Sequence, residues 1–87
     1  LRVKGSSMTG AGIFDGDLIV VDRSLEPANN TVVVAVIDGE LTVKRLEYSD
    51  GRPRLSAENP DFAPIELRNG QELTIWGVVT SVIHTVS

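Results

Sequence analysis

A run of β-branched residues in the middle of this 87-residue chain most constrains its fold. Residues 31–37 read Thr-Val-Val-Val-Ala-Val-Ile. Side chains branched at Cβ lose rotational freedom in a helix and fit the pleated surface of a sheet. The dipeptide Asp38-Gly39 follows, and a second apolar segment covers residues 41–47. Because Asp-Gly is a preferred two-residue turn between antiparallel strands, the sequence predicts a β-hairpin here.

Short apolar segments separated by turn residues cover the rest of the chain. Further strands are predicted at residues 17–22 after Asp15-Gly16, at 53–57 after Asp50-Gly51, at 62–67 before Asn69-Gly70, and at 73–86. Gly77 interrupts the last segment and predicts a bulge or bend in it. No segment keeps a helical period of apolar residues. The pattern therefore indicates the all-β class, as a barrel or a sandwich.

Length and charge restrict the function classes. A chain of this length forms one small domain, here residues 1–87. Its 12 acidic and 8 basic residues give a net charge of −4, which disfavours direct DNA binding, because that needs a basic surface. The chain has no cysteine, in keeping with a cytoplasmic location. No apolar run approaches the roughly 18–20 residues that cross a bilayer, so no membrane contact is expected.

The last predicted strand is apolar on both of its faces. One face carries Leu73, Ile75, Val79 and Ile83, and the other carries Trp76, Val78, Val82 and Val86. Water covers neither face cheaply. A folded β corner would bury both faces within the domain, whereas a homodimer would bury one face against a second subunit. We favour the homodimer, because large apolar patches usually mark association.

Ser7 and Lys44 are the strongest candidates for catalytic residues. Ser7 lies in the small-residue segment Gly-Ser-Ser-Met-Thr-Gly, and Lys44 lies in the middle of a predicted strand. A lysine amine in a partly dry site has a lowered pKa and can act as a base toward a serine hydroxyl. The alternative is an edge-strand lysine whose amine reaches water, beside an ordinary turn serine. Residue spacing alone leaves both interpretations open.

Other chemistries receive less support. His84 is the only histidine, and its alternation with Val82 and Val86 favours a packing or interface role over a serine–histidine triad. The acids Asp15, Asp17, Asp22, Asp38 and Glu40 lie at turns and strand ends, where carboxylates are usually solvated. Their spacing does not make a calcium loop. We therefore expect no metal site and no cofactor.

Four segments, taken together, resemble the LexA/UmuD family of self-cleaving serine proteases, the peptidase S24-like family. They are Gly5-Ser6-Ser7-Met8 with the following Gly12-Ile13, Asp15-Gly16-Asp17 and Val20-Val21-Asp22; residues 38–46; residues 58–65; and Trp76-Gly77-Val78-Val79 with Val82-Ile83. The order is that of the family, and Ser7 and Lys44 stand 37 positions apart, the family separation. The resemblance covers nearly the whole chain.

The resemblance implies a fold and a set of roles. The fold would be a small, highly twisted, partly open β-barrel or sandwich. Ser7 would be the nucleophile and Lys44 the general base of an autocatalytic endopeptidase. The backbone N–H groups of Ser7 and Met8 would form the oxyanion site. A serine–lysine pair is a known variant of triad logic and needs no histidine.

The residues 77–84 look more like the UmuD branch than the repressor branch. That resemblance implies an SOS-response protein whose dimer serves a Y-family, UmuC-like polymerase in translesion synthesis, after cleavage stimulated by the RecA filament on single-stranded DNA. The cleavable arm that such proteins carry upstream would then lie outside this chain. The alternative is the dimerisation and autoproteolysis domain of a LexA- or phage-type repressor. A membrane signal peptidase is a more distant third.

Overall fold

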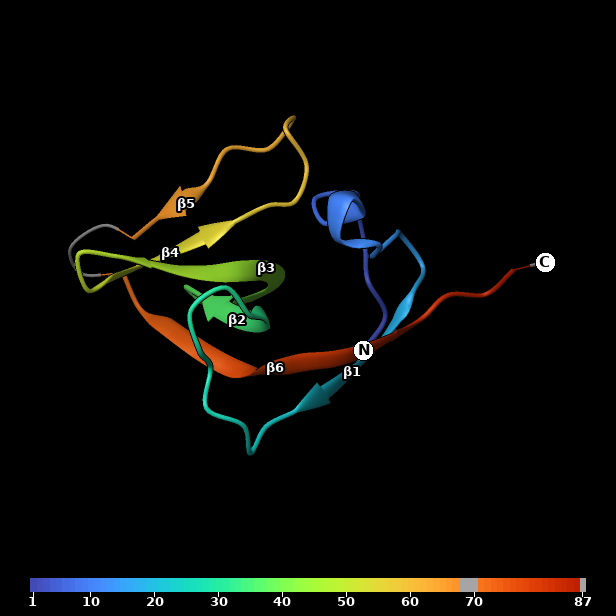
Figure 1. The fold of residues 1–87 in the computed structure, drawn as a ribbon, viewed down its shortest axis with the longest axis horizontal. Helices are drawn as coiled ribbons and strands as arrows, with labels where there is room; N and C mark the ends of the chain where they lie inside the picture. Colours follow the sequence, from blue (N-terminus) through green and yellow to red (C-terminus); the bar gives the residue numbers. More distant parts are fainter. Residues whose placement is uncertain (68–70, 87) are drawn as a thin grey trace.

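The computed structural model describes residues 1–67 and 71–86, which fold into one antiparallel sheet (Figure 1). Its elements are a 3₁₀ turn, η1 (Thr9–Ala11), and the strands β1 (Leu18–Asp22), β2 (Val32–Ile37), β3 (Glu40–Ser49), β4 (Arg52–Ser56), β5 (Ile65–Glu66) and β6 (Leu73–Ile83). The strand order is β1-β6-β2-β3-β4-β5. The all-β prediction is confirmed. The sheet stays open, because β1 and β5 are edge strands that do not meet.

Two Asp-Gly turns connect the central strands, as the sequence predicts. Asp38 and Gly39 have φ angles of 48° and 87°, and Asp50 and Gly51 have 51° and 75°. Positive φ at both central residues defines the turn whose twist matches that of the flanking strands. Asp38-Gly39 therefore pairs β2 with β3, and Asp50-Gly51 pairs β3 with β4.

Two predicted strands are shorter than expected. The segment predicted at 62–67 contributes only β5, because a turn occupies its start: the Asn59 side chain accepts the N–H of Asp61, and the Asn59 carbonyl accepts the N–H of Phe62. The segment predicted at 73–86 ends as a strand at Ile83. The Asn69-Gly70 turn lies outside the described residues.

Strand β6 contains the irregularity that Gly77 predicts. In the ladder with β2 the register skips Trp76, and in the ladder with β1 it skips Thr80. Each skipped residue marks a bulge, which bends a strand and increases its twist. A Cβ on Gly77 would collide with the side chain of Val21, so only glycine lets β1 come this close.

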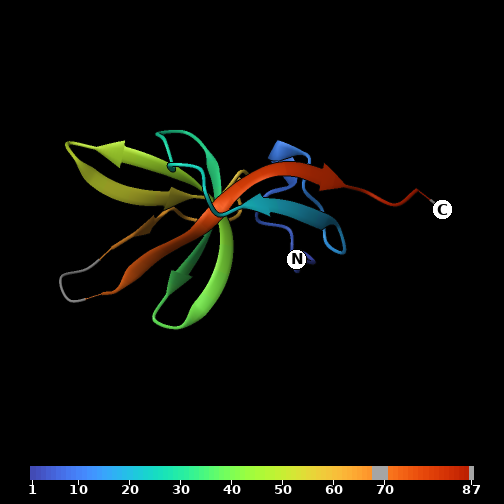
Figure 2. The same ribbon diagram turned by 90° about the horizontal axis from the view of Figure 1, so that it is seen from below.

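Strand β2 is buried on both faces and separates two hydrophobic clusters. The first cluster consists of Val3, Met8, Ile13, Ile19 and Val34. The second cluster consists of Val33, Ala35, Leu46, Leu55 and Val78. Figure 2 shows the N-terminal segment beside β1 and the second half of β6, away from the β3–β4 hairpin. The first cluster therefore joins the sheet to the N-terminal segment.

The two halves of β6 differ in burial. Leu73 and Ile75 pack on the second cluster, and Trp76 and Val79 pack on the first. The folded-corner interpretation therefore describes the first half. In the second half, Ile83 is exposed and pairs with Leu18 on β1, which is also exposed. The homodimer stays a prediction.

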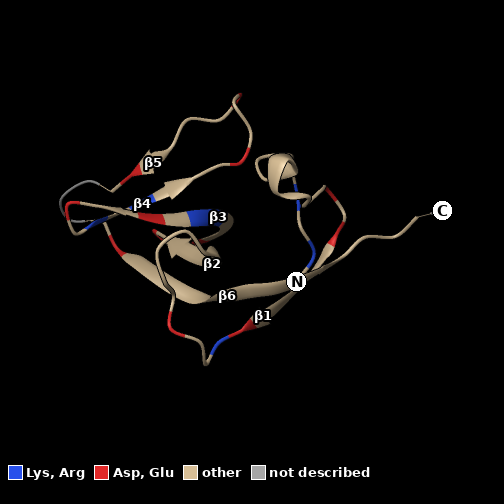
Figure 3. Cartoon of the chain, in the orientation of Figure 1, with Lys and Arg blue, Asp and Glu red and all other residues tan. Residues whose placement is uncertain are grey.

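Charged side chains are dispersed over the molecule. Figure 3 shows Lys and Arg on the N-terminal segment, β3, β4 and the loop after β1, with acidic residues between them. No helix in the described ranges has the length and apolar character that a bilayer crossing requires.

Candidate active site

The turn that carries Ser7, residues 5–12, is held at both ends by left-handed glycines. Gly5 has a φ of 88° and Gly12 a φ of 80°, values that cost other residues strain. The N–H of Gly5 donates to Asp15 Oδ1 at 2.7 Å. Inside the turn, Met8 is only 2% exposed and packs in the first cluster. The buried Met8 side chain thus anchors the turn, next to the partly buried Ser7.

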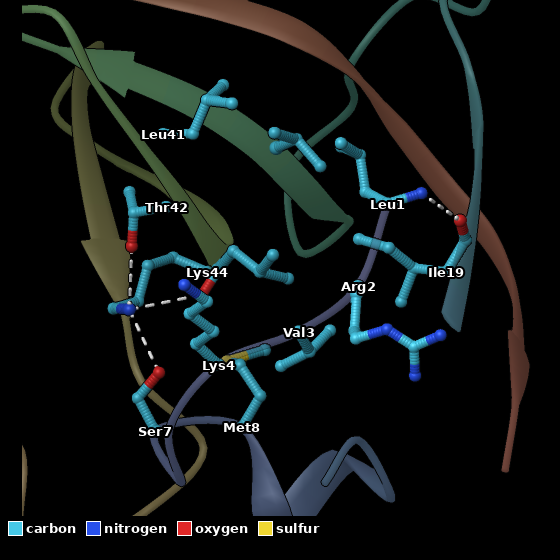
Figure 4. A pocket seen from close by; sticks show the side chains of 12 residues that line it. Leu1, Arg2, Val3, Lys4, Ser7, Met8, Ile19, Leu41, Thr42 and Lys44 are labelled. Carbon is cyan, nitrogen blue, oxygen red and sulfur yellow. Dashed lines mark hydrogen bonds between the residues drawn. The ribbon is translucent and has the colours of Figure 1, made fainter. Parts of the chain in front are cut away.

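Lys44 lies in β3 and reaches the Ser7 turn directly. Its Nζ is 2.9 Å from Ser7 Oγ, 2.8 Å from Thr42 Oγ1 and 3.1 Å from the Val43 carbonyl oxygen (Figure 4). β3 pairs with β4 only from Arg45 onward. Lys44 is therefore the last residue of β3 before that pairing begins. The stretch of β3 that carries it is not paired with β4.

The three oxygens around Nζ suit both protonation states of Lys44. An ammonium has three N–H donors, one for each oxygen. A neutral amine has two N–H donors and a lone pair. The Val43 carbonyl accepts one N–H, Thr42 Oγ1 accepts the other, and the lone pair is left for the Ser7 hydroxyl proton. The loss of one proton therefore converts the contact with Ser7 into that of a base with its acid.

Burial lowers the pKa of Lys44 from its ordinary value of 10.5, because a partly dry site disfavours the charged form. None of the salt bridges among the described residues includes Lys44. No carboxylate therefore offsets the effect of burial. The local environment favours the neutral amine that a general base must be.

A cleft of about 400 Å³ opens beside the two residues. It is lined by Leu1, Arg2, Val3, Lys4, Ser7, Met8, Ile19, Val34, Leu41, Thr42, Val43 and Lys44. Figure 4 shows Ser7, Thr42 and Lys44 grouped at one side of this cleft, with Leu1 and Ile19 at the other. Its size and its walls, which are polar and apolar in about equal parts, fit a site that receives a short peptide segment.

The backbone N–H groups of Ser7 and Met8 differ in their hydrogen bonding from the Met8 carbonyl. Neither donates a hydrogen bond to any residue of the described ranges. The Met8 carbonyl, by contrast, accepts the N–H groups of Ala11 and Ile13, at 3.0 and 3.2 Å. The Met8 carbonyl is therefore satisfied, whereas the N–H groups of Ser7 and Met8 have no acceptor among the described residues.

His84 has a different partner from the one a serine–histidine triad needs. Its Nδ1 is 2.5 Å from Asp17 Oδ1, and its ring lies 5.6 Å from that of Phe14. His84 therefore partners Asp17 through a side chain that stays 53% exposed, and the expected packing role describes only its contact with Phe14. The expectation of a solvated Asp17 is wrong: the residue is 2% exposed. Hydrogen bonds from His84 and from the Phe14 N–H hold the pKa of Asp17 below its ordinary value.

The sequence analysis missed two residues that contact the site. Thr42 touches Lys44, and its position two residues earlier on the same strand face could have revealed it. Asn59 touches the Ser7 turn, where its Nδ2 donates to the Ser6 carbonyl at 2.8 Å. Nothing in the local pattern indicates that contact, since it joins positions 53 residues apart.

Comparison with known proteins places the chain in a family. The profile described as Peptidase S24-like matches residues 1–80. The LexA repressor of Bordetella pertussis is 47% identical over 85 residues, which cover 98% of this chain and 39% of that protein. The LexA repressor of Xylella fastidiosa strain M23 is 51% identical over 84 residues, 97% of this chain and 40% of that protein. The chain thus spans about two fifths of these relatives.

These relatives overturn the UmuD interpretation, because they are named as repressors. The expected role as polymerase accessory subunit was wrong, and the UmuC-like partner has no support. The residues behind that expectation, 77–84, belong mainly to β6, where Gly77 makes room for Val21. Packing contacts of this kind do not indicate which function the rest of a protein has. The family assignment itself is firm: the chain belongs to the peptidase S24-like family.

Proposed function

We propose that this chain is the self-cleaving serine-protease domain of a LexA-type transcriptional repressor, with Ser7 as nucleophile and Lys44 as general base. The observation that carries the proposal is the 2.9 Å contact between Lys44 Nζ and Ser7 Oγ at the side of a cleft. The names of the relatives support the repressor part, and the family match supports the peptidase part.

The reaction follows from the arrangement around Lys44. In its neutral form, Lys44 takes the Ser7 hydroxyl proton as Oγ attacks a peptide carbonyl in the cleft. Oγ–carbon bond formation gives a tetrahedral oxyanion, and Lys44 returns the proton to the leaving amine as the C–N bond breaks. Water then hydrolyses the acyl-enzyme. Thr42 and the Val43 carbonyl hold Nζ in place through these steps.

The unpartnered N–H groups of Ser7 and Met8 supply the oxyanion site. Backbone donors that are already oriented stabilise the developing negative charge without reorganisation. Met8 contributes through its burial as well, because a fixed side chain fixes the direction of its amide. Arg2 and Lys4 line the same cleft and add positive charge there.

Two partners belong to the proposal through the family resemblance. One is a second copy of the chain, for which the exposed apolar residues of β1 and β6 provide a surface. The other is the RecA filament on single-stranded DNA, as the stimulus of cleavage. In a repressor, cleavage would separate this domain from the part that binds DNA.

The test uses the full-length protein that contains this chain. Purified protein is incubated at alkaline pH, and separately with RecA filament at neutral pH, and mass spectrometry identifies the products. We expect one internal cut under both conditions, and no cut in Ser7→Ala or Lys44→Ala. The matched control is Ser24→Ala, in an exposed turn after β1, which should be cut at the wild-type rate.

Cleavage by either active-site variant at the wild-type rate would refute the assignment of residues. A wild-type protein that stays intact under both conditions would refute the self-cleaving function.

A further inference from the structure

We propose that loop 58–61 positions the nucleophile: Asn59 and the Glu58 carbonyl hold the Ser7 turn where Ser7 meets Lys44. This inference rests on the proposed function. The loop follows β4 and belongs to neither the cleft lining nor the serine–lysine pair. Its residues are positioning residues, since they touch the turn and not the reacting atoms.

Three hydrogen bonds join the loop to the turn, and the two shortest lie one on each side of Ser7. Asn59 Nδ2 donates to the Ser6 carbonyl at 2.8 Å, immediately before the nucleophile. The N–H of Gly10 donates to the Glu58 carbonyl at 2.7 Å, three residues after it. Together with the buried Met8 side chain, these contacts hold the turn from two directions.

The loop is itself tied to the strand that carries the base. Arg45, the residue after Lys44, forms a salt bridge from Nε to Glu58 Oε1. Its Nη1 also donates to the Asn30 carbonyl at 2.6 Å. Consecutive residues of β3 thus reach the Ser7 turn by two routes: Lys44 directly, and Arg45 through Glu58. In this arrangement, the contact through Arg45 and Glu58 fixes the distance between Lys44 Nζ and Ser7 Oγ.

Gly10 makes this close approach possible. A Cβ at Gly10 would lie 2.6 Å from the Glu58 carbonyl oxygen, nearer than real Cβ contacts allow. The φ of Gly10 does not lie in the left-handed region, so its backbone suits alanine. The absence of a side chain at this position serves the contact with loop 58–61. The added methyl group in Gly10→Ala would therefore push the turn away from Glu58 and disturb this contact alone.

Asn59 is suited to its task by two separate groups. Its Oδ1 accepts the N–H of Asp61 at 2.9 Å, which shapes the loop. Its Nδ2 is thereby directed to the Ser6 carbonyl and lies 3.5 Å from Thr9 Oγ1. Aspartate at this position would keep the loop-shaping acceptor and lose the donor to the turn.

The experiment measures self-cleavage of the full-length protein as a function of pH in Asn59→Leu, Asn59→Asp and Gly10→Ala. We expect Asn59→Leu and Gly10→Ala to lower the plateau rate by roughly 10- to 100-fold, since a small misplacement of a nucleophile costs that much. The pH midpoint in these two variants should equal that of the wild type, because burial of Lys44 sets it. Asn59→Asp should also be slow. Thermal unfolding confirms that each variant is folded at the assay temperature.

A second readout needs no cleavable segment. Labelling of Ser7 by a fluorophosphonate probe should slow in the same variants. The matched control is Asp22→Ala. It removes a similar turn at the end of β1, in which Asp22 Oδ1 accepts the Ser24 N–H at 2.8 Å. It should cleave and label like the wild type.

Three outcomes would overturn the positioning role while the cleavage assay still works. The variants could cleave and label within about twofold of wild type, they could lose activity only in step with unfolding, or their pH midpoint could move without a change in plateau. If Asn59→Leu does not fold, Gly10→Ala decides the matter. An inactive wild type is a different result, which refutes the proposed function.

Discussion

The two hydrophobic clusters lie on opposite faces of β2 and are built differently. Val33 belongs to one and its neighbour Val34 to the other. All five buried members of the second cluster come from strands, and four of them are completely inaccessible to solvent. In the first cluster, Val3, Met8 and Ile13 come from irregular segments. The second cluster resembles an ordinary core, whereas the first also orients the Ser7 turn beside a cleft.

The difference shows where each cluster obtains its order. Ladder hydrogen bonds fix the backbone of the second cluster, so side-chain packing completes a frame that already exists. The N-terminal segment has one isolated bridge to the sheet, Arg2 with Leu18. It depends on Met8, on the Asp15–Asp17 turn and on loop 58–61 instead. The site thus lies on the face that is held by fewer and more specific contacts.

The largest expected effect separates chemistry from stability. Ser7→Ala and Lys44→Ala should each lower the self-cleavage rate by at least about 10³-fold, since each removes a group that the proposed mechanism uses in the transition state. Urea denaturation should give a free energy of unfolding near that of wild type. A large loss of stability in Ser7→Ala would mean that the site and the first cluster are not separable.

Next in size is a direct contrast between the clusters. Leu46→Ala and Met8→Ala should each destabilise the fold by about 2–5 kcal/mol, the range for large-to-small changes in a core. Only Met8→Ala should also slow cleavage by the folded fraction, because Met8 anchors the turn of Ser7. Calorimetry and cleavage rates on the same samples test this. Equal slowing by Leu46→Ala would contradict the division of roles.

The cleavage rate should depend on pH with a known sign. Below the lowered pKa of Lys44, each pH unit should raise the unstimulated rate about tenfold, because the fraction of neutral amine rises tenfold. Above it the rate should level off. A rate that does not rise with pH anywhere below about pH 10 would exclude a lysine base.

The free energy of unfolding should also depend on pH through Lys44. The unfolded chain has the ordinary Lys44 pKa of 10.5, and the folded chain a lower one. Between the two values the unfolded state binds more protons, so the contribution of Lys44 to stability increases with pH in that window. Lys44→Met should remove this increase, which urea midpoints across the window would show.

The smallest effect concerns Thr42. Thr42→Val keeps the shape of the side chain and removes the oxygen 2.8 Å from Lys44 Nζ. We expect cleavage to slow by roughly threefold to tenfold, in line with a lost hydrogen bond of about 1 kcal/mol. Thr42→Ser, which keeps the hydroxyl, is the control and should stay close to wild type.

Local chemistry accounts for the parts of the fold that the sequence predicts. The Asp38-Gly39 and Asp50-Gly51 hairpins follow from residues that tolerate positive φ, and the bulge in β6 follows from Gly77. The insertion of β6 between β1 and β2 does not follow, because it depends on pairing across most of the chain. Long-range pairing leaves no mark in a short window of sequence.

The site divides in the same way. Ser7 and Lys44 were identified through family resemblance, since no spacing rule joins a turn to a strand 37 residues away. Thr42 follows from strand alternation once Lys44 is known. The burial of Asp17 and the contact of Asn59 with Ser6 were not predictable, because each depends on a segment that meets it only in the folded chain.

The two skipped residues of β6 divide that strand into sections with independent alignment. Thr80 is the extra residue between Val79 and Ser81, so its deletion would leave Ser81 opposite Val20 and remove the bulge. Leu73 and Ile75 would keep their neighbours on β2. Deletion of Thr80 would therefore straighten the β1–β6 pair while the partners of residues 81–83 on β1 and the pairing of β6 with β2 stay in place.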